Sequence, residues 1–64
     1  MTQKELLYVE DAIGHEDEMI NILEYSITKT NDKELISYLE DEVKNHENLK
    51  TKLIKKLGSV SNEW

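Results

Sequence analysis

The five residues Thr28–Asp32, TKTND, separate two long segments in which apolar residues recur every three or four positions. That recurrence is typical of an amphipathic helix. Asn31, followed by Glu34, fits a capping box, in which side chains satisfy the free amides at a helix start. Because the connection is short, two helices on either side of it become antiparallel neighbours. The sequence therefore predicts an all-α, antiparallel helical hairpin.

The segment before this connection is predicted to be helical over about residues 3–29. Thr2 and Glu5 form a capping box at its start. Its apolar residues cover about half of the helix circumference, which is more than contact with one other helix needs. Those residues are Leu6, Tyr8, Val9, Ala12, Ile13, Met19, Ile20, Ile22, Leu23 and Ile27.

The segment after the connection is predicted to be helical over about residues 32–57. Lysines gather near its end, where cations interact favourably with the helix dipole, and Gly58 is a natural terminator. We therefore expect one domain, residues 1–58, and a flexible tail over residues 59–64. The apolar positions of this helix are Leu35, Ile36, Leu39, Val43, Leu49, Leu53 and Leu57.

Length and charge limit the classes of function. The chain has 64 residues, no cysteine and a formal net charge of −6. Such a charge disfavours binding to nucleic acid and to anionic membranes. The first residues, MTQKELLYVED, carry acids where a signal peptide needs an apolar core, so we expect a cytoplasmic protein.

A chain this small buries little of its surface and is marginally stable on its own. The broad apolar arc of the first helix therefore predicts a homodimer, in which an antiparallel pair of hairpins closes a four-helix bundle. Larger assemblies of the protein are compatible with the same pattern. The residues expected in the dimer contact are Val9, Ala12, Ile13, Met19, Ile20, Leu23, Leu39 and Leu49.

Three ionisable residues stand at positions where apolar residues are expected. Glu16 lies on the apolar stripe of the first helix, and Glu42 and His46 lie on that of the second. If the chain folds back near residues 30–31, residues whose numbers add up to about 61 face each other. Glu16 is then level with His46, and Glu42 lies one turn away. The sequence thus predicts a polar layer inside the bundle, which a dimer doubles to four carboxylates and two imidazoles.

The polar layer has two interpretations. A hydrogen-bonded network can fix helix register and dimer orientation without any ligand. Alternatively, Glu16, Glu42 and His46 are metal ligands, because carboxylate and imidazole groups suit iron, manganese or zinc. His15, at the edge of the same arc, is a candidate additional ligand or a partly exposed edge residue. No nucleophile or water-activating centre is evident, so the pattern predicts no catalytic residue.

Three stretches resemble the small ferritin-like helical-hairpin proteins, and among them the coat-F type of spore coat protein. They are YVEDAIGHEDEM (8–19), NDKELISYLEDE (31–42) and EVKNHENL (42–49). The last is similar to the E-E-x-x-H pattern of rubrerythrin-type helices, with Glu42 as its first acid and Val43 in place of its second. The resemblance implies a ferritin-like four-helix bundle, association with spores and a structural role in spore coat assembly.

Two further functions stay open beside that structural role. The metal-binding alternative is a ferritin-like bundle with an iron- or manganese-type centre. The other alternative is a small regulator of a sporulation phosphorelay, because helical-hairpin phosphatases of this size carry a Ser-Gln signature early in their second helix. Here Ser37 and Asp41 are present, but Tyr38 replaces the glutamine.

Overall fold

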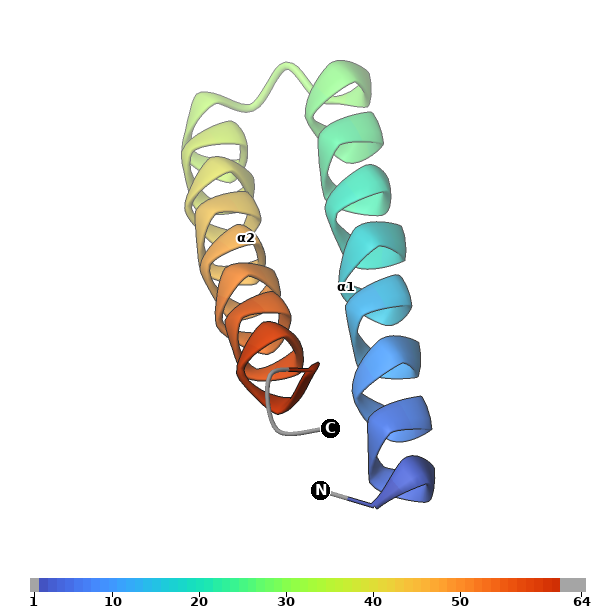
Figure 1. The fold of residues 1–64 in the computed structure, drawn as a ribbon. Helices are drawn as coiled ribbons and strands as arrows, with labels where there is room; N and C mark the ends of the chain where they lie inside the picture. Colours follow the sequence, from blue (N-terminus) through green and yellow to red (C-terminus); the bar gives the residue numbers. More distant parts are fainter. Residues whose placement is uncertain (1, 62–64) are drawn as a thin grey trace.

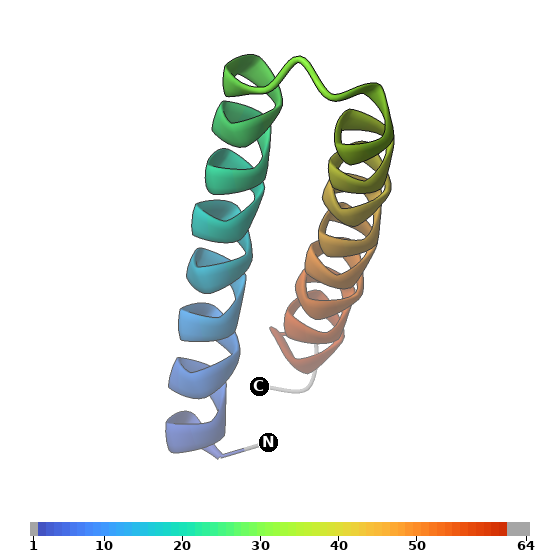
Figure 2. The ribbon, with the colours of Figure 1, turned by 180° about the vertical axis from the view of Figure 1, so that it is seen from behind.

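The computed structural model describes residues 2–61 as two long helices joined by a short connection (Figure 1). Helix α1 spans Gln3–Lys29, and helix α2 spans Lys33–Ser61. The helices run antiparallel and lie side by side when seen from the front and from behind (Figures 1 and 2). The described part of the chain contains no other helix and no strand. The predicted all-α hairpin is confirmed.

Helix α1 begins with the predicted capping box. The hydroxyl of Thr2 accepts a hydrogen bond from the Glu5 amide at 3.1 Å, and Glu5 Oε1 accepts one from the Thr2 amide at 3.1 Å. The bond from the Thr2 amide, followed by the contact with the Thr2 side chain, holds the pKa of Glu5 below its ordinary value. The reciprocal bonds fix the first residue of the helix.

The cap of α2 differs by one residue from the prediction. Asp32, rather than Asn31, caps the helix, and its Oδ1 accepts hydrogen bonds from the amides of Glu34 at 3.0 Å and Leu35 at 3.1 Å. The Thr30 hydroxyl accepts a bond from the Asp32 amide at 3.2 Å. Aspartate and asparagine are comparable caps, but only aspartate brings a negative charge to the positive end of the helix dipole.

Helix α2 also continues past its predicted end. Gly58 lies inside the helix, and no described glycine has a positive φ angle. A glycine that terminates a helix uses the left-handed conformation, which Gly58 does not adopt. Glycine inside a helix costs only about 1 kcal/mol relative to alanine, so it does not end the helix by itself. Of the expected tail, residues 62–64 lie outside the described residues.

The hairpin is elongated and has little interior. Its principal extents are 49 × 15 × 11 Å, and its radius of gyration is 14.8 Å. A compact domain of this length would have a radius of gyration of about 11 Å. No apolar side chain in the described residues is fully buried, and Glu16 is the one residue among them classed as buried. The apolar side chains between the helices are therefore only half covered.

One side of the hairpin is polar, and we call it the groove side. An ion pair joins Asp17 Oδ1 of α1 to Lys50 Nζ of α2 at 2.5 Å. Asp17 is turned from Glu16 by about 100° around α1. Two shallow hollows lie along this side, and residues of both helices line each of them.

The opposite side is apolar, and we call it the open face. On α1, Tyr8 and Ile22 are turned from Glu16 by about 80° and 120° in the direction opposite to Asp17. These two side chains are 59% and 58% exposed. Half-exposed Met19 lies on the same side of the helix.

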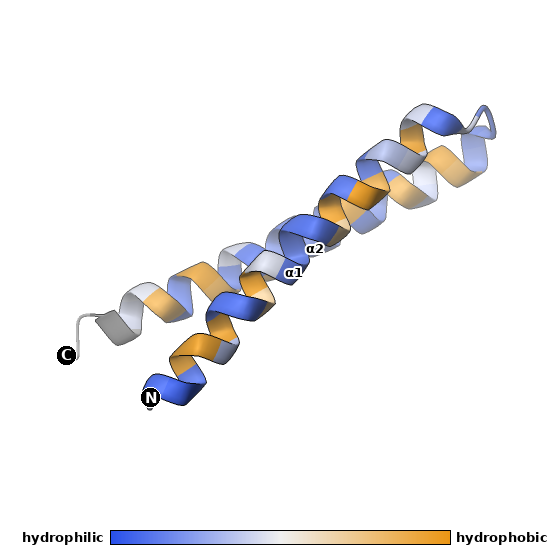
Figure 3. Ribbon diagram, turned by 90° about the vertical axis from the view of Figure 1, so that its right-hand side faces the viewer, coloured by the Kyte–Doolittle hydropathy of each residue, from blue (hydrophilic) through white to orange (hydrophobic). Residues whose placement is uncertain are grey.

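Helix α2 contributes to the open face in the same way. Tyr38 and Leu49 are turned from His46 by about 80° and 60°, away from Glu47 on the groove side. They are 61% and 44% exposed. Figure 3 shows hydrophobic and hydrophilic residues alternating at short intervals along both helices. The open face consists of Tyr8, Met19, Ile22, Tyr38 and Leu49.

Candidate functional site: a glutamate–histidine pair between the helices

The predicted facing of Glu16 and His46 is present in the structure. Glu16 is the central residue of α1, and His46 lies one residue before the centre of α2. Nδ1 of the His46 ring and Oε2 of Glu16 form a hydrogen bond that links the two helices. Glu16 is 8% exposed. The least exposed group of the described hairpin is thus a carboxylate with an imidazole as its partner.

Position along the helix explains this burial. Glu16 has Ala12 and Ile13 on the preceding turn and Met19 and Ile20 on the following one, so apolar residues flank it on both sides. In such surroundings a carboxylate without a hydrogen-bond donor is costly, and the ring N–H of His46 supplies that donor. The pair therefore depends on both of its members.

Glu42 lies close to the pair but does not complete a compact centre. Its Oε2 is 3.9 Å from Nε2 of His46, and its Oε1 accepts a long, 3.5 Å hydrogen bond from the Asn45 side chain. The Glu42 side chain is 32% exposed, compared with 10% for that of Glu16. With Nδ1 engaged by Glu16, the Nε2 atom of His46 is the ring position that faces Glu42.

The single hairpin does not assemble a metal centre. Among the described residues, no three or more histidine, cysteine or acidic side chains are grouped closely enough to hold an ion. His15, the additional candidate ligand, is exposed. Metal binding by Glu16, Glu42 and His46 therefore stays a prediction that needs ligands from a second chain.

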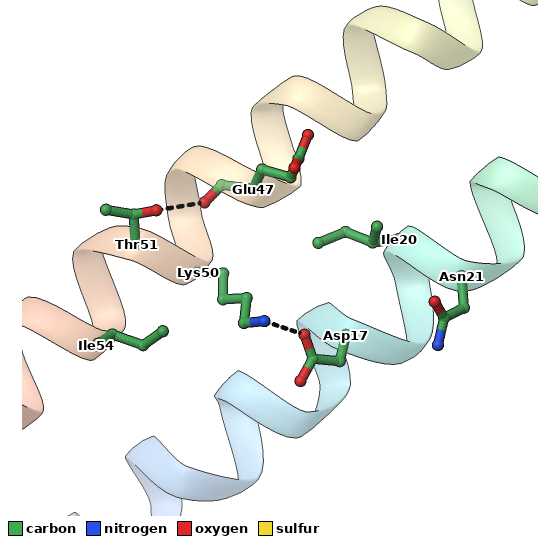
Figure 4. A pocket seen from close by; sticks show the side chains of 7 residues that line it. All are labelled: Asp17, Ile20, Asn21, Glu47, Lys50, Thr51 and Ile54. Atoms are coloured by element: carbon green, nitrogen blue, oxygen red, sulfur yellow. Dashed lines mark hydrogen bonds and ion pairs between the residues drawn. The ribbon is translucent and has the colours of Figure 1, made fainter.

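The Asp17–Lys50 ion pair was not predicted from the sequence. Figure 4 shows it in a hollow of the groove side, where the Lys50 side chain extends from α2 towards Asp17 on α1. The signal that could have found it is the opposite charge of two residues at nearly facing levels and at similar angles around their helices. The hollow is lined by Asp17, Ile20, Asn21, Glu47, Lys50, Thr51 and Ile54.

Comparison with known protein families, curated proteins and solved structures finds no match. In the described residues, neither helix has a stretch long and apolar enough to cross a bilayer. The fold and the site define the class as an all-helical hairpin with a buried Glu–His pair. The likeness to coat-F type proteins stays a prediction based on short sequence patterns.

Proposed function

We propose that the protein is a structural and interaction protein that acts as a homodimer. In this proposal the open faces of two hairpins pack together and form a four-helix bundle. The observation that supports it is the apolar surface of the open face, given that a single hairpin has no fully buried apolar side chain among its described residues. Exposed apolar area of this kind is typical of interaction surfaces.

The exposed area also has the size that a dimer contact needs. A compact monomer of this mass exposes about 4,200 Å². The hairpin exposes 5061 Å². The excess of roughly 850 Å² is close to the area that each partner contributes to a standard protein interface. A second copy of the chain offers a matching apolar face without requiring any other partner.

In the proposed dimer the Glu16–His46 pair sets geometry. Buried polar pairs contribute little net stability, but they disfavour arrangements in which their hydrogen bonds are lost. Because the pair lies at the middle of both helices, a shift by one turn would separate Glu16 from His46. The resemblance to coat-F type proteins suggests spore coat assembly as the setting of this role.

Sedimentation analysis tests the proposed dimer. We expect a mass of twice the 7.5 kDa of the chain at micromolar concentration. The unfolding temperature should rise with protein concentration, because folding and association are coupled. A species of single-chain mass, with an unfolding temperature independent of concentration, would contradict the proposal.

A second candidate function, metal binding, is favoured by the closeness of Glu16, Glu42 and His46. In a dimer, two such sets could combine into one site for iron, manganese or zinc. Protein purified without a histidine tag should then contain stoichiometric metal, and added metal should raise its unfolding temperature. His46→Gln should abolish both effects, whereas His15→Gln, at an exposed position, should not. Metal-free wild-type protein with no thermal response excludes this candidate.

A further inference from the structure

We infer that the groove side of one dimer binds the lysine-rich end of α2 from another dimer, so that dimers associate further. This inference rests on the proposed dimer, because that contact covers the open face and leaves the groove side available. The partner is thus a second copy of the same chain, bound through a different surface. The reasons lie in the distribution of charge over the hairpin.

The groove side carries an excess of carboxylates near the connection between the helices. One of its two hollows is lined by Glu24, Ile27, Glu40, Val43, Lys44 and Glu47. Three of these side chains are acidic and one is basic. None of the three carboxylates takes part in an ion pair within the described residues. The half-buried Ile27 and Val43 form the apolar part of the hollow.

The opposite charge is concentrated at the far end of α2. Lys50, Lys52, Lys55 and Lys56 are half of the eight lysines of the chain, and no acidic residue occurs between residues 48 and 61. Lys50 is paired with Asp17. The other three are exposed and form no ion pair within the described part of the hairpin. An acidic protein thus presents three unpaired cations within five residues.

The two surfaces are chemically complementary. A lysine side chain can lay its methylene groups along Ile27 and Val43 while its ammonium group reaches a carboxylate at the edge of the hollow. Each exposed ion pair is weak alone and is screened by salt, so several must form together. Lys52, Lys55 and Lys56 provide three cations for Glu24, Glu40 and Glu47.

The geometry of this contact allows assembly to continue. The hollow lies towards the connection, whereas the lysines lie at the other end of the hairpin, so one copy cannot bring its own two surfaces together along α2. A contact between two different surfaces is heterologous, and it can repeat from copy to copy without closing. Each dimer would carry two hollows and two lysine-rich ends.

Sedimentation and light scattering at two salt concentrations test the inference. At about 20 mM salt, where charges act over roughly 20 Å, the mean mass should rise at least about twofold above that of the dimer, and at about 500 mM it should return to the dimer. The triple variant Lys52→Gln, Lys55→Gln, Lys56→Gln should stay dimeric at low salt. The matched control is Lys4→Gln, Lys29→Gln, Lys33→Gln, which changes the net charge equally and should still assemble.

A charge exchange makes the test specific. Lys52→Glu, Lys55→Glu, Lys56→Glu and, separately, Glu24→Lys, Glu40→Lys, Glu47→Lys should each abolish association beyond the dimer, and mixing the two variants should restore it. Wild-type protein that remains a dimer at low salt, or variants that fail to associate when mixed, would overturn the inference while leaving the dimer intact. Wild-type protein that is monomeric would instead contradict the proposed function. Lysine variants that assemble normally would show that the lysines serve another, anionic partner.

Discussion

Replacing Ile22 with glutamate is expected to dissociate the dimer and to unfold most of the chain. Ile22 is 58% exposed in the single hairpin and belongs to the open face. In the proposed dimer it becomes buried, so the variant loses about 2 kcal/mol of apolar burial at each of two copies. It also places two carboxylates in an apolar contact, where each costs several kcal/mol without a partner. The sum is comparable to the whole stability of a small domain.

Leu7 offers a matched control for this substitution. It is 56% exposed, but it lies on the side of α1 that faces away from both α2 and the open face. Leu7→Glu should therefore retain the dimer and its helical content, as measured by sedimentation and circular dichroism at equal concentration. If the two variants behave alike, the open face is not the dimer contact.

The second large effect is expected at the Glu16–His46 pair. His46→Leu leaves the buried Glu16 carboxylate without its donor, and we expect a loss of about 3–5 kcal/mol of stability. Glu16→Leu leaves the imidazole without an acceptor, but that ring is 24% exposed, compared with 10% for the Glu16 side chain. Water can reach it, so the expected loss is smaller, about 1–3 kcal/mol.

The double variant Glu16→Leu, His46→Leu should recover most of the stability or exceed that of the wild type, because no unpaired polar group remains. Urea unfolding at one fixed protein concentration measures all four proteins on a common scale. Losses that simply add in the double variant would mean that the two side chains do not act as a pair. Glu42→Gln, which removes a more exposed carboxylate, should change the stability little.

The sequence predicts the hairpin and the Glu16–His46 contact for the same physical reason. Long amphipathic patterns determine where helices run, and a three-residue connection leaves little freedom in how they face each other. The sum rule of about 61 therefore placed Glu16 opposite His46, which the structure joins by a hydrogen bond. Errors of one residue in the connection shift that facing by less than one helical turn.

Other features depended on choices that the pattern leaves equal. Asn31 and Asp32 are adjacent and both cap helices well, so the sequence alone did not select Asp32. Gly58 can end a helix or continue it, depending on a backbone angle that composition does not determine. Exposed acids and lysines are numerous, which hid the Asp17–Lys50 pair among many alternatives.

The expected dimer residues show a different limit. Of the eight residues, Leu49 is exposed, whereas the other seven are already half covered in the single hairpin. Helical periodicity identifies an apolar arc but does not divide it between the partner helix of the same chain and a second chain. The open face, with Tyr8, Ile22 and Tyr38, makes that division visible.

The connection itself has a consequence for the architecture. It contains neither glycine nor proline, and no residue within it adopts a positive φ angle. Reversal of the chain is thus supported locally by the hydroxyl of Thr30 and the carboxylate of Asp32. Without these two oxygens the backbone could continue as one rod of about 90 Å. A pair of rods and a pair of hairpins are then neighbouring solutions for almost the same amino-acid sequence.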